Sequence, residues 1–164
     1  MTTPKTNIAT DAVARTITVS RTFAAPRERV FGAFTTPEHL AHWWSPEGWT
    51  TETLAHALVP GGVWRYVMRG PGGMESRGKT TYREIDAPSR FVYSDAFADA
   101  EGNPIEGLSV TLTTVEFAEQ DGKTTVTSIT RFASEEDLQK IVSMGVIAGV
   151  TQTWERLATY LGGE

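Results

Sequence analysis

The chain has 164 residues, of which 40% are hydrophobic and 10% aromatic, and it contains no cysteine. This length fits one domain with its own core, and the lack of cysteine excludes a disulfide scaffold, a thiol nucleophile and a cysteine-ligated metal. Fifteen basic against twenty acidic residues give a net charge of −5, which argues against a nucleic-acid-binding surface. The sequence shows no signal peptide, and no apolar run approaches the ~20 residues that span a bilayer. We therefore expect a cytoplasmic protein without membrane insertion.

The N-terminal part begins with a short polar stretch. Residues 1–14 are small and polar, and we expect them to form a flexible arm ahead of a single domain at residues 15–164. Thr16–Phe23 alternates apolar with polar side chains, which predicts a half-buried strand. Two short helices are predicted next, because Pro26 suits a first helical turn and Thr36-Pro37-Glu38 combines a hydroxyl cap, a proline and an early acid.

The middle of the chain has the pattern of an antiparallel meander. Segments with strand-like patterns are separated by turns that contain glycine, proline and aspartate. The longest connection, Asp99–Gly107, is polar and is predicted to be a mobile loop. The predicted strands are Thr50–His56, Val63–Arg69, Ser76–Asp86, Arg90–Phe97, Leu108–Ala118 and Thr124–Phe132.

The chain closes with a predicted long amphipathic helix from Ser134 to about Leu161. Ser134 and Asp137 resemble a capping box at its start. Gly145 and Gly149 fall on its apolar stripe, where they either permit close approach of a sheet or leave space unfilled. A sheet of about seven strands that curves around this helix buries both apolar faces, so the predicted fold class is α+β.

Five segments together carry a family resemblance. They are Phe23–Phe31, Thr36–Pro46, Val59–Arg65, Arg83–Tyr93 and Gly149–Leu157. With these segments the chain resembles the START-like (SRPBCC) superfamily, in the branch related to the C-terminal domain of the Hsp90 ATPase activator Aha1. The resemblance implies a helix-grip fold, in which a curved antiparallel sheet wraps a long C-terminal helix and two short helices follow the first strand. Superfamily members bind lipids, sterols, hormones or polyketides, and a minority catalyse cyclisation or hydrolysis, so the resemblance indicates fold better than function.

Strand alternation predicts which side chains face the final helix. In Val63–Arg69 the two arginines mark the wet face, so the Trp64, Tyr66 and Met68 side chains face inward. Aromatic residues with a few placed polar groups are typical of a ligand site, although aromatic residues also fill plain cores, and both interpretations stay open. The predicted ligand-binding residues are Trp43, Trp64, Tyr66, Met68, Tyr82, Phe91, Tyr93, Asp95, Phe97, Met144, Gly145 and Ala148.

Asp95 is the one candidate for a catalytic residue. Its place between Tyr93 and Phe97 on the inward face would desolvate the carboxyl group, raise its pKa and allow it to act as a base. The alternative, which we favour, is a carboxylate that is solvated near the strand end or paired with Arg131.

No metal site is predicted. His39 and His42 lie three residues apart on the second short helix, a spacing that metal ligands can have. No third ligand is near them in the sequence, and His56 lies beyond a strand break. We find no nucleophile elbow and no phosphate-binding glycine loop, and we predict no cofactor.

The primary hypothesis is therefore a binding protein for an apolar or aromatic, lipid-like small molecule, without catalysis. Its cavity would lie between the sheet and the final helix, with entry gated by Asp99–Gly107 and Trp43–Trp49. The alternatives are a co-chaperone-like interaction module with a stress-related role, which the resemblance implies, and a polyketide cyclase or aromatase. A chaperone contact and a homodimer are further hypotheses about partners.

Overall fold

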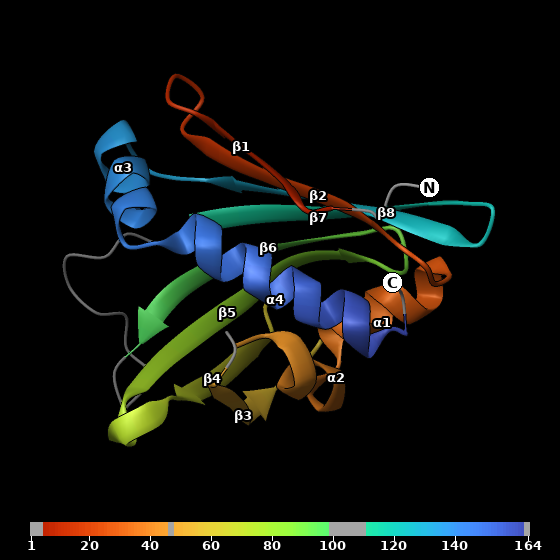
Figure 1. Ribbon diagram of the computed structural model, residues 1–164, viewed down its shortest axis with the longest axis horizontal. Coiled ribbons are helices and arrows are strands. Elements are labelled where there is room, and N and C mark those ends of the chain that lie inside the picture. The colour runs from red at the N-terminus through yellow and green to blue at the C-terminus, as the bar shows by residue number, and fades with distance from the viewer. Residues whose placement is uncertain (1–4, 46–47, 99–110, 163–164) are drawn as a thin grey trace.

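The computed structural model describes residues 5–45, 48–98 and 111–162, and of Phe97 and Ala98 the backbone alone. Over these residues the chain forms an eight-stranded antiparallel sheet, and a long helix lies across one face of it (Figure 1). The strands are β1 (Asn7–Asp11), β2 (Thr16–Phe23), β3 (Thr50–His56), β4 (Val63–Arg69), β5 (Glu75–Asp86), β6 (Arg90–Ala98), β7 (Thr111–Gln120) and β8 (Lys123–Arg131). The helices are α1 (Arg27–Thr35), α2 (Pro37–Trp43), α3 (Glu135–Ser143) and α4 (Val146–Tyr160), with a single 3-10 turn, η1 (Pro71–Gly73).

The sheet topology is that of a grip around one helix. The strand order is β1-β2-β8-β7-β6-β5-β4-β3, and neighbouring strands run antiparallel. β2 and β3 follow each other in the sequence but lie far apart in the sheet, and α1 and α2 connect them at one end (Figure 1). This arrangement confirms the predicted α+β class and the helix-grip fold.

The N-terminal residues differ from the sequence prediction. Asn7–Asp11, expected to belong to a flexible arm at residues 1–14, form edge strand β1, which pairs with residues 16–20. The Asp11 carboxylate accepts the N–H groups of Val13 and Ala14 at 3.0 Å each and so stabilises the turn to β2. Because β1 has one neighbour and mostly exposed side chains, it lacks the apolar alternation by which a half-buried strand is found. The sheet therefore begins before residue 15 and has one strand more than the roughly seven expected.

The predicted long C-terminal helix is divided in two. Its start is as expected, because Ser134 accepts the N–H of Asp137 at 3.1 Å. α3 ends at Ser143 and α4 begins at Val146, and between them Gly145 takes a φ of +88°, a left-handed value that favours glycine. α3 and α4 consequently point in different directions (Figure 1), so a single stripe does not describe the buried faces of both.

The C-terminal half of α4 packs closely against α1 and the sheet. Trp154, Leu157 and Leu161 are buried. The ring of Phe34 in α1 meets Trp154 edge-on at 5.7 Å between centroids, and it meets Phe117 of β7 in the same way at 5.4 Å. Such edge-to-face pairs add to the stabilisation from area burial and fix how closely the elements approach. The C-terminal half of α4 is therefore tightly packed against α1 and the sheet.

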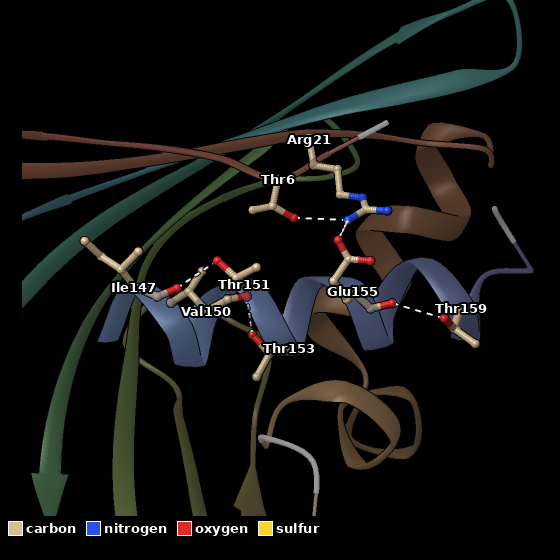
Figure 2. Close-up of polar contacts among 8 residues, drawn as sticks. All are labelled: Thr6, Arg21, Ile147, Val150, Thr151, Thr153, Glu155 and Thr159. Atoms are coloured by element: carbon tan, nitrogen blue, oxygen red, sulfur yellow. Dashed lines mark hydrogen bonds and ion pairs between the residues drawn. The ribbon is translucent and has the colours of Figure 1, made fainter. Parts of the chain in front are cut away.

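A buried arginine also joins α4 to the sheet (Figure 2). The Arg21 side chain of β2 is 2% exposed, and its Nη1 donates to Glu155 Oε1 at 2.7 Å and to Thr6 Oγ1 at 3.1 Å. The guanidinium also lies 5.7 Å from the ring centroid of Phe23. Because the Glu155 side chain is 56% exposed, the ion pair runs from the core to the solvent and ties α4 to β2.

Glu155→Ala is expected to lower the free energy of unfolding by about 1–2 kcal/mol, because the Arg21 guanidinium would remain buried with one partner fewer. Glu84→Ala is the matched control, since it removes an ion pair with Arg90 whose side chains are both exposed, and it should leave the stability almost unchanged. Urea denaturation of the wild type and both variants measures the difference. Equal costs for the two variants would contradict an anchoring role for Glu155.

Candidate functional site

A cavity of about 360 Å³ lies between the sheet and the N-terminal half of α4. The inward face of the sheet forms its floor, and residues of α1, α2, α3 and α4 form the rest of its lining. The sheet residues that line it are Ile17, Val19, Tyr66, Met68, Tyr93, Asp95, Ala96, Thr111, Thr113, Val115, Ser128 and Thr130, with Phe132 just after β8. The other lining residues are Phe34, Trp43, Trp44, Asp137, Lys140, Ile141, Val146, Gly149, Val150, Thr153 and Trp154.

Four residues of α4 form the roof of the cavity. Val146, Gly149, Val150 and Thr153 recur at intervals of three and four, so they share one face of the helix. All four are half-buried, whereas the inward residues further along α4 are buried. A Cβ atom built on Gly149 would meet no atom within 4 Å. The space under this glycine is therefore unfilled.

Aromatic rings form one wall. Tyr66 of β4 stacks on Trp64 with 4.2 Å between ring centroids, and Trp44 meets both rings edge-on. Tyr66 also lies directly over Gly78 of β5, where a Cβ atom would come within 2.2 Å of Tyr66 Cζ. Gly78 thus provides the space that the Tyr66 ring occupies, and the ring position sets the width of this side of the cavity.

Asp95 places a carboxyl group on the cavity floor. The registers of β6 with β5 and β7 set Asp95 opposite Thr80 on one side and Thr111 on the other. Thr80 Oγ1 donates to Asp95 Oδ1 at 3.0 Å. Burial raises the pKa of Asp95 to about 6, and the hydrogen bonds from Thr80 and from the backbone N–H of Ala96 oppose that rise. The charge of this side chain therefore changes just below neutral pH.

Three tyrosine hydroxyls lie in the electrostatic field of Asp95. Burial is the main cause that raises the pKa values of Tyr66, Tyr82 and Tyr93, and the Asp95 charge adds to it. Hydrogen bonds with Trp44, for Tyr66, and with Thr113, for Tyr93, act in the opposite direction. These hydroxyls stay protonated at neutral pH, so they can donate or accept hydrogen bonds but carry no charge.

The structure brings together five of the predicted ligand-binding residues. Trp43, Tyr66, Met68, Tyr93 and Asp95 all line the cavity. The interpretation favoured for Asp95 from the sequence is wrong, because its carboxyl group faces the cavity and is held by Thr80. Arg131, the partner that the sequence offered for it, is an exposed residue on the other face of β8, as strand alternation requires.

The other predicted residues lie elsewhere. Trp64, Tyr82 and Phe91 are buried on the inward face, but they pack within the core and do not line the cavity. Met144, Gly145 and Ala148 are exposed, because the break at Gly145 separates α3 from α4 and places the inward stripe of α4 on other residues. The side chain of Phe97 and the Asp99–Gly107 segment lie outside the described residues. So does part of the Trp43–Trp49 segment.

The sequence reasoning missed the hydroxyl-rich floor formed by β7 and β8. Thr113 and Thr130 face the cavity, with 2.9 Å between their Oγ1 atoms. Apolar residues normally mark the inward face of a strand. On β7 and β8 this rule is misleading, because Leu112 and Ile129 are exposed on the outer face. The neighbouring apolar residues Val115 and Phe117 give the correct alternation, because they share the inward parity of Thr113.

Each of the three histidines contacts a tyrosine. His39 Nδ1 lies 2.5 Å from the Tyr160 hydroxyl, His42 stacks on the same ring, and His56 Nε2 lies 3.2 Å from the Tyr82 hydroxyl. Within residues 5–45, 48–98 and 111–162, no three His, Cys, Asp or Glu residues are grouped so that they would hold a metal ion. None of the helices in this part of the chain has the length and apolar character to cross a membrane.

A curved sheet wrapped around one long helix, with a cavity between the two, defines a START-like, helix-grip protein. The family model described as Activator of Hsp90 ATPase homolog 1-like protein matches residues 24–162. The chain therefore belongs to this Aha1-like family. A comparison with curated proteins finds no significant match.

Solved structures of bacterial proteins share the fold over nearly the whole chain. A crystal structure of a protein from Mycobacterium smegmatis is 34% identical, with a TM-score of 0.89 over 96% of this chain and 97% of that one. A solution structure from Arthrobacter aurescens is 32% identical, with a TM-score of 0.90 and coverage of 95% and 91%. Another, from Staphylococcus epidermidis, is 31% identical, with a TM-score of 0.83 and coverage of 95% and 93%.

The raised pKa of Asp95 predicts how stability depends on pH. The folded chain keeps this proton up to about pH 6, whereas the unfolded chain loses it near 3.8, so stability falls as the pH rises through this window. Relative to the wild type, Asp95→Asn should therefore gain roughly 2–3 kcal/mol between pH 4 and pH 7, since one pKa unit corresponds to about 1.4 kcal/mol.

Urea denaturation of both proteins across this pH range measures that gain. Thr80→Val is the second variant, because it removes the donor that favours the charged carboxylate and should move the step to higher pH. A stability difference between the wild type and Asp95→Asn that does not change with pH would show that Asp95 is ionised normally in the folded protein.

Proposed function

We propose that this protein binds an apolar or aromatic small molecule in the cavity between α4 and the sheet. The observation that carries the proposal is the 360 Å³ of unfilled space under Gly149. Small-molecule sites commonly measure about 300–1,000 Å³ and combine an apolar lining with a few polar groups. The cavity has this character, with aliphatic and aromatic side chains around Asp95 and the threonines of the floor.

The binding energy would come mainly from the burial of apolar surface. A ligand that buries about 200 Å² of such surface gains roughly 5 kcal/mol at about 25 cal/mol per Å². Edge contacts with Trp44, Tyr66 and Tyr93 would orient an aromatic ring. Five kcal/mol alone corresponds to a dissociation constant of roughly 0.2 mM. Tighter binding therefore requires more buried area or polar contacts that offset the cost of association.

Binding is better supported than catalysis. Acid–base catalysis needs a second group placed to complete proton transfer or to hold the developing charge. Next to Asp95 lie Thr80, which donates a hydrogen bond to it, and tyrosine hydroxyls whose protons are firmly held. The other charged groups that line the cavity, Asp137 and Lys140, come from α3. A cyclase or aromatase activity therefore has less support than a binding function.

A chaperone contact rests on family membership. The family description names an activator of the Hsp90 ATPase, but fold membership alone does not transfer a function. Homodimer formation likewise stays a prediction from the sequence. The cavity is the feature of the described structure that favours one function over the others.

Gly149→Leu should place a bulky side chain in the cavity and weaken ligand binding without unfolding the protein. The fluorophore prodan, which is aromatic and carries no hydrogen-bond donor, serves as the probe, and its emission should shift to the blue on binding to the wild type. We expect Gly149→Leu to weaken binding by tenfold or more and to keep or raise the melting temperature, because a glycine inside a helix costs about 1 kcal/mol.

Ala148→Leu is the matched control. Ala148 is the neighbouring residue on the exposed side of the same helix, so a leucine there adds the same side chain outside the cavity. This variant should bind prodan like the wild type. The proposal is wrong if the wild type binds prodan no better than millimolar, or if Gly149→Leu binds it as well as Ala148→Leu does.

A further inference from the structure

The polar groups of the cavity are unequally satisfied, and this inequality indicates what kind of ligand fits. The inference rests on the proposed function, because it concerns the same cavity. Thr113 and Thr130 are hydrogen-bonded to each other, and the Thr153 hydroxyl donates to the Val150 carbonyl of its own helix at 3.0 Å (Figure 2). Because these hydroxyls already have hydrogen-bond partners within the protein, they do not require one from a ligand.

Asp95 differs from these hydroxyls. An ionised carboxylate is an acceptor with about four lone-pair positions. Two donors are seen in the structure, the Thr80 hydroxyl at 3.0 Å and the backbone N–H of Ala96. Thr111 Oγ1 lies near the same residue but is directed at its backbone carbonyl, 3.5 Å away. The carboxylate therefore has acceptor capacity that its described neighbours do not use, and it faces the cavity.

We propose that the ligand carries a hydrogen-bond donor, a hydroxyl or a protonated amine, which binds the Asp95 carboxylate while an apolar body fills the space under Gly149. A donor in this position would complete the coordination of a carboxylate that burial has partly stripped of water. Hydrogen bonds to a charged partner are among the stronger ones, and they gain most where water is excluded.

The charges around the cavity favour a donor over an acid. Asp137 and Lys140 of α3 also line the cavity, so its described charged residues are two carboxylates and one ammonium group. Tyr66, Tyr82 and Tyr93 are neutral, as described above. A ligand carboxylate would be repelled by Asp95 and would have to rely on Lys140, whereas an ammonium or hydroxyl group matches Asp95 directly.

Four naphthalene compounds of nearly the same shape test the proposal. They are 2-(2-naphthyl)ethylamine, 2-(2-naphthyl)ethanol, 2-ethylnaphthalene and 2-naphthylacetate, each competing with prodan at pH 8, where Asp95 is ionised. For the wild type we expect the amine and the alcohol to bind about tenfold more tightly than the hydrocarbon. The carboxylate should bind most weakly.

Asp95→Leu and Asp95→Asn then test the role of the residue. Asp95→Leu should remove the preference of the protein for the amine and the alcohol over 2-ethylnaphthalene, the three affinities being compared within this variant. Asp95→Asn should weaken the amine by about tenfold and the alcohol by less, because the amide is a neutral acceptor. A melting curve of each variant establishes that it is folded, and the wild-type series decides the question even if one of them is not.

Each result has a distinct meaning. If prodan binds and the four compounds bind equally, the donor proposal is wrong and the binding function stands. Tightest binding by 2-naphthylacetate would also overturn it, and would assign the polar contact to Lys140, which Lys140→Met then checks. If neither prodan nor any of the four compounds binds, the proposed function and this inference are both wrong.

Discussion

The cavity exists because α4 is held firmly against the sheet at one end. In its C-terminal half, Trp154 and Leu157 are packed into the aromatic core and Glu155 is tied to buried Arg21. In its N-terminal half, the inward side chains are small or short, and the one at Gly149 is missing. A rigid helix cannot bend down to close a gap of this kind. The space is therefore a consequence of how the other end of the helix is fixed.

The same arrangement places a carboxyl group where it reduces stability. Burial raises the pKa of Asp95, so its ionised form at neutral pH is less favourable in the folded protein than in the unfolded one. An aliphatic residue at this inward position of β6 would extend the core beside Tyr93. Groups that are unfavourable for folding are frequently found at binding and catalytic sites, and this association supports a role for Asp95 in the cavity.

The sequence predicted the strands and their inward faces correctly where apolar and polar residues alternate clearly. On β4 the arginines identified the wet face, and Trp64 and Tyr66 were placed inward correctly. β1 escaped detection because an edge strand with exposed side chains has little patterning. Gly149 and Leu157 were placed inward correctly. Gly145 and Ala148 were not, because a continuous helix was assumed through Gly145, whose left-handed backbone conformation could not be distinguished from a helical glycine without coordinates.

The two inward glycines show why the cavity itself lay beyond prediction. Gly78 is small because the Tyr66 ring occupies the place of its side chain, whereas the space beside Gly149 is empty. In the sequence the two residues look alike, as glycines on the inward face of a regular element. The two glycines differ only in what lies opposite them: the Tyr66 ring packs over Gly78, whereas no atom packs over Gly149. Related proteins with this fold share the grip, but the side chains that meet in the gap determine the ligand.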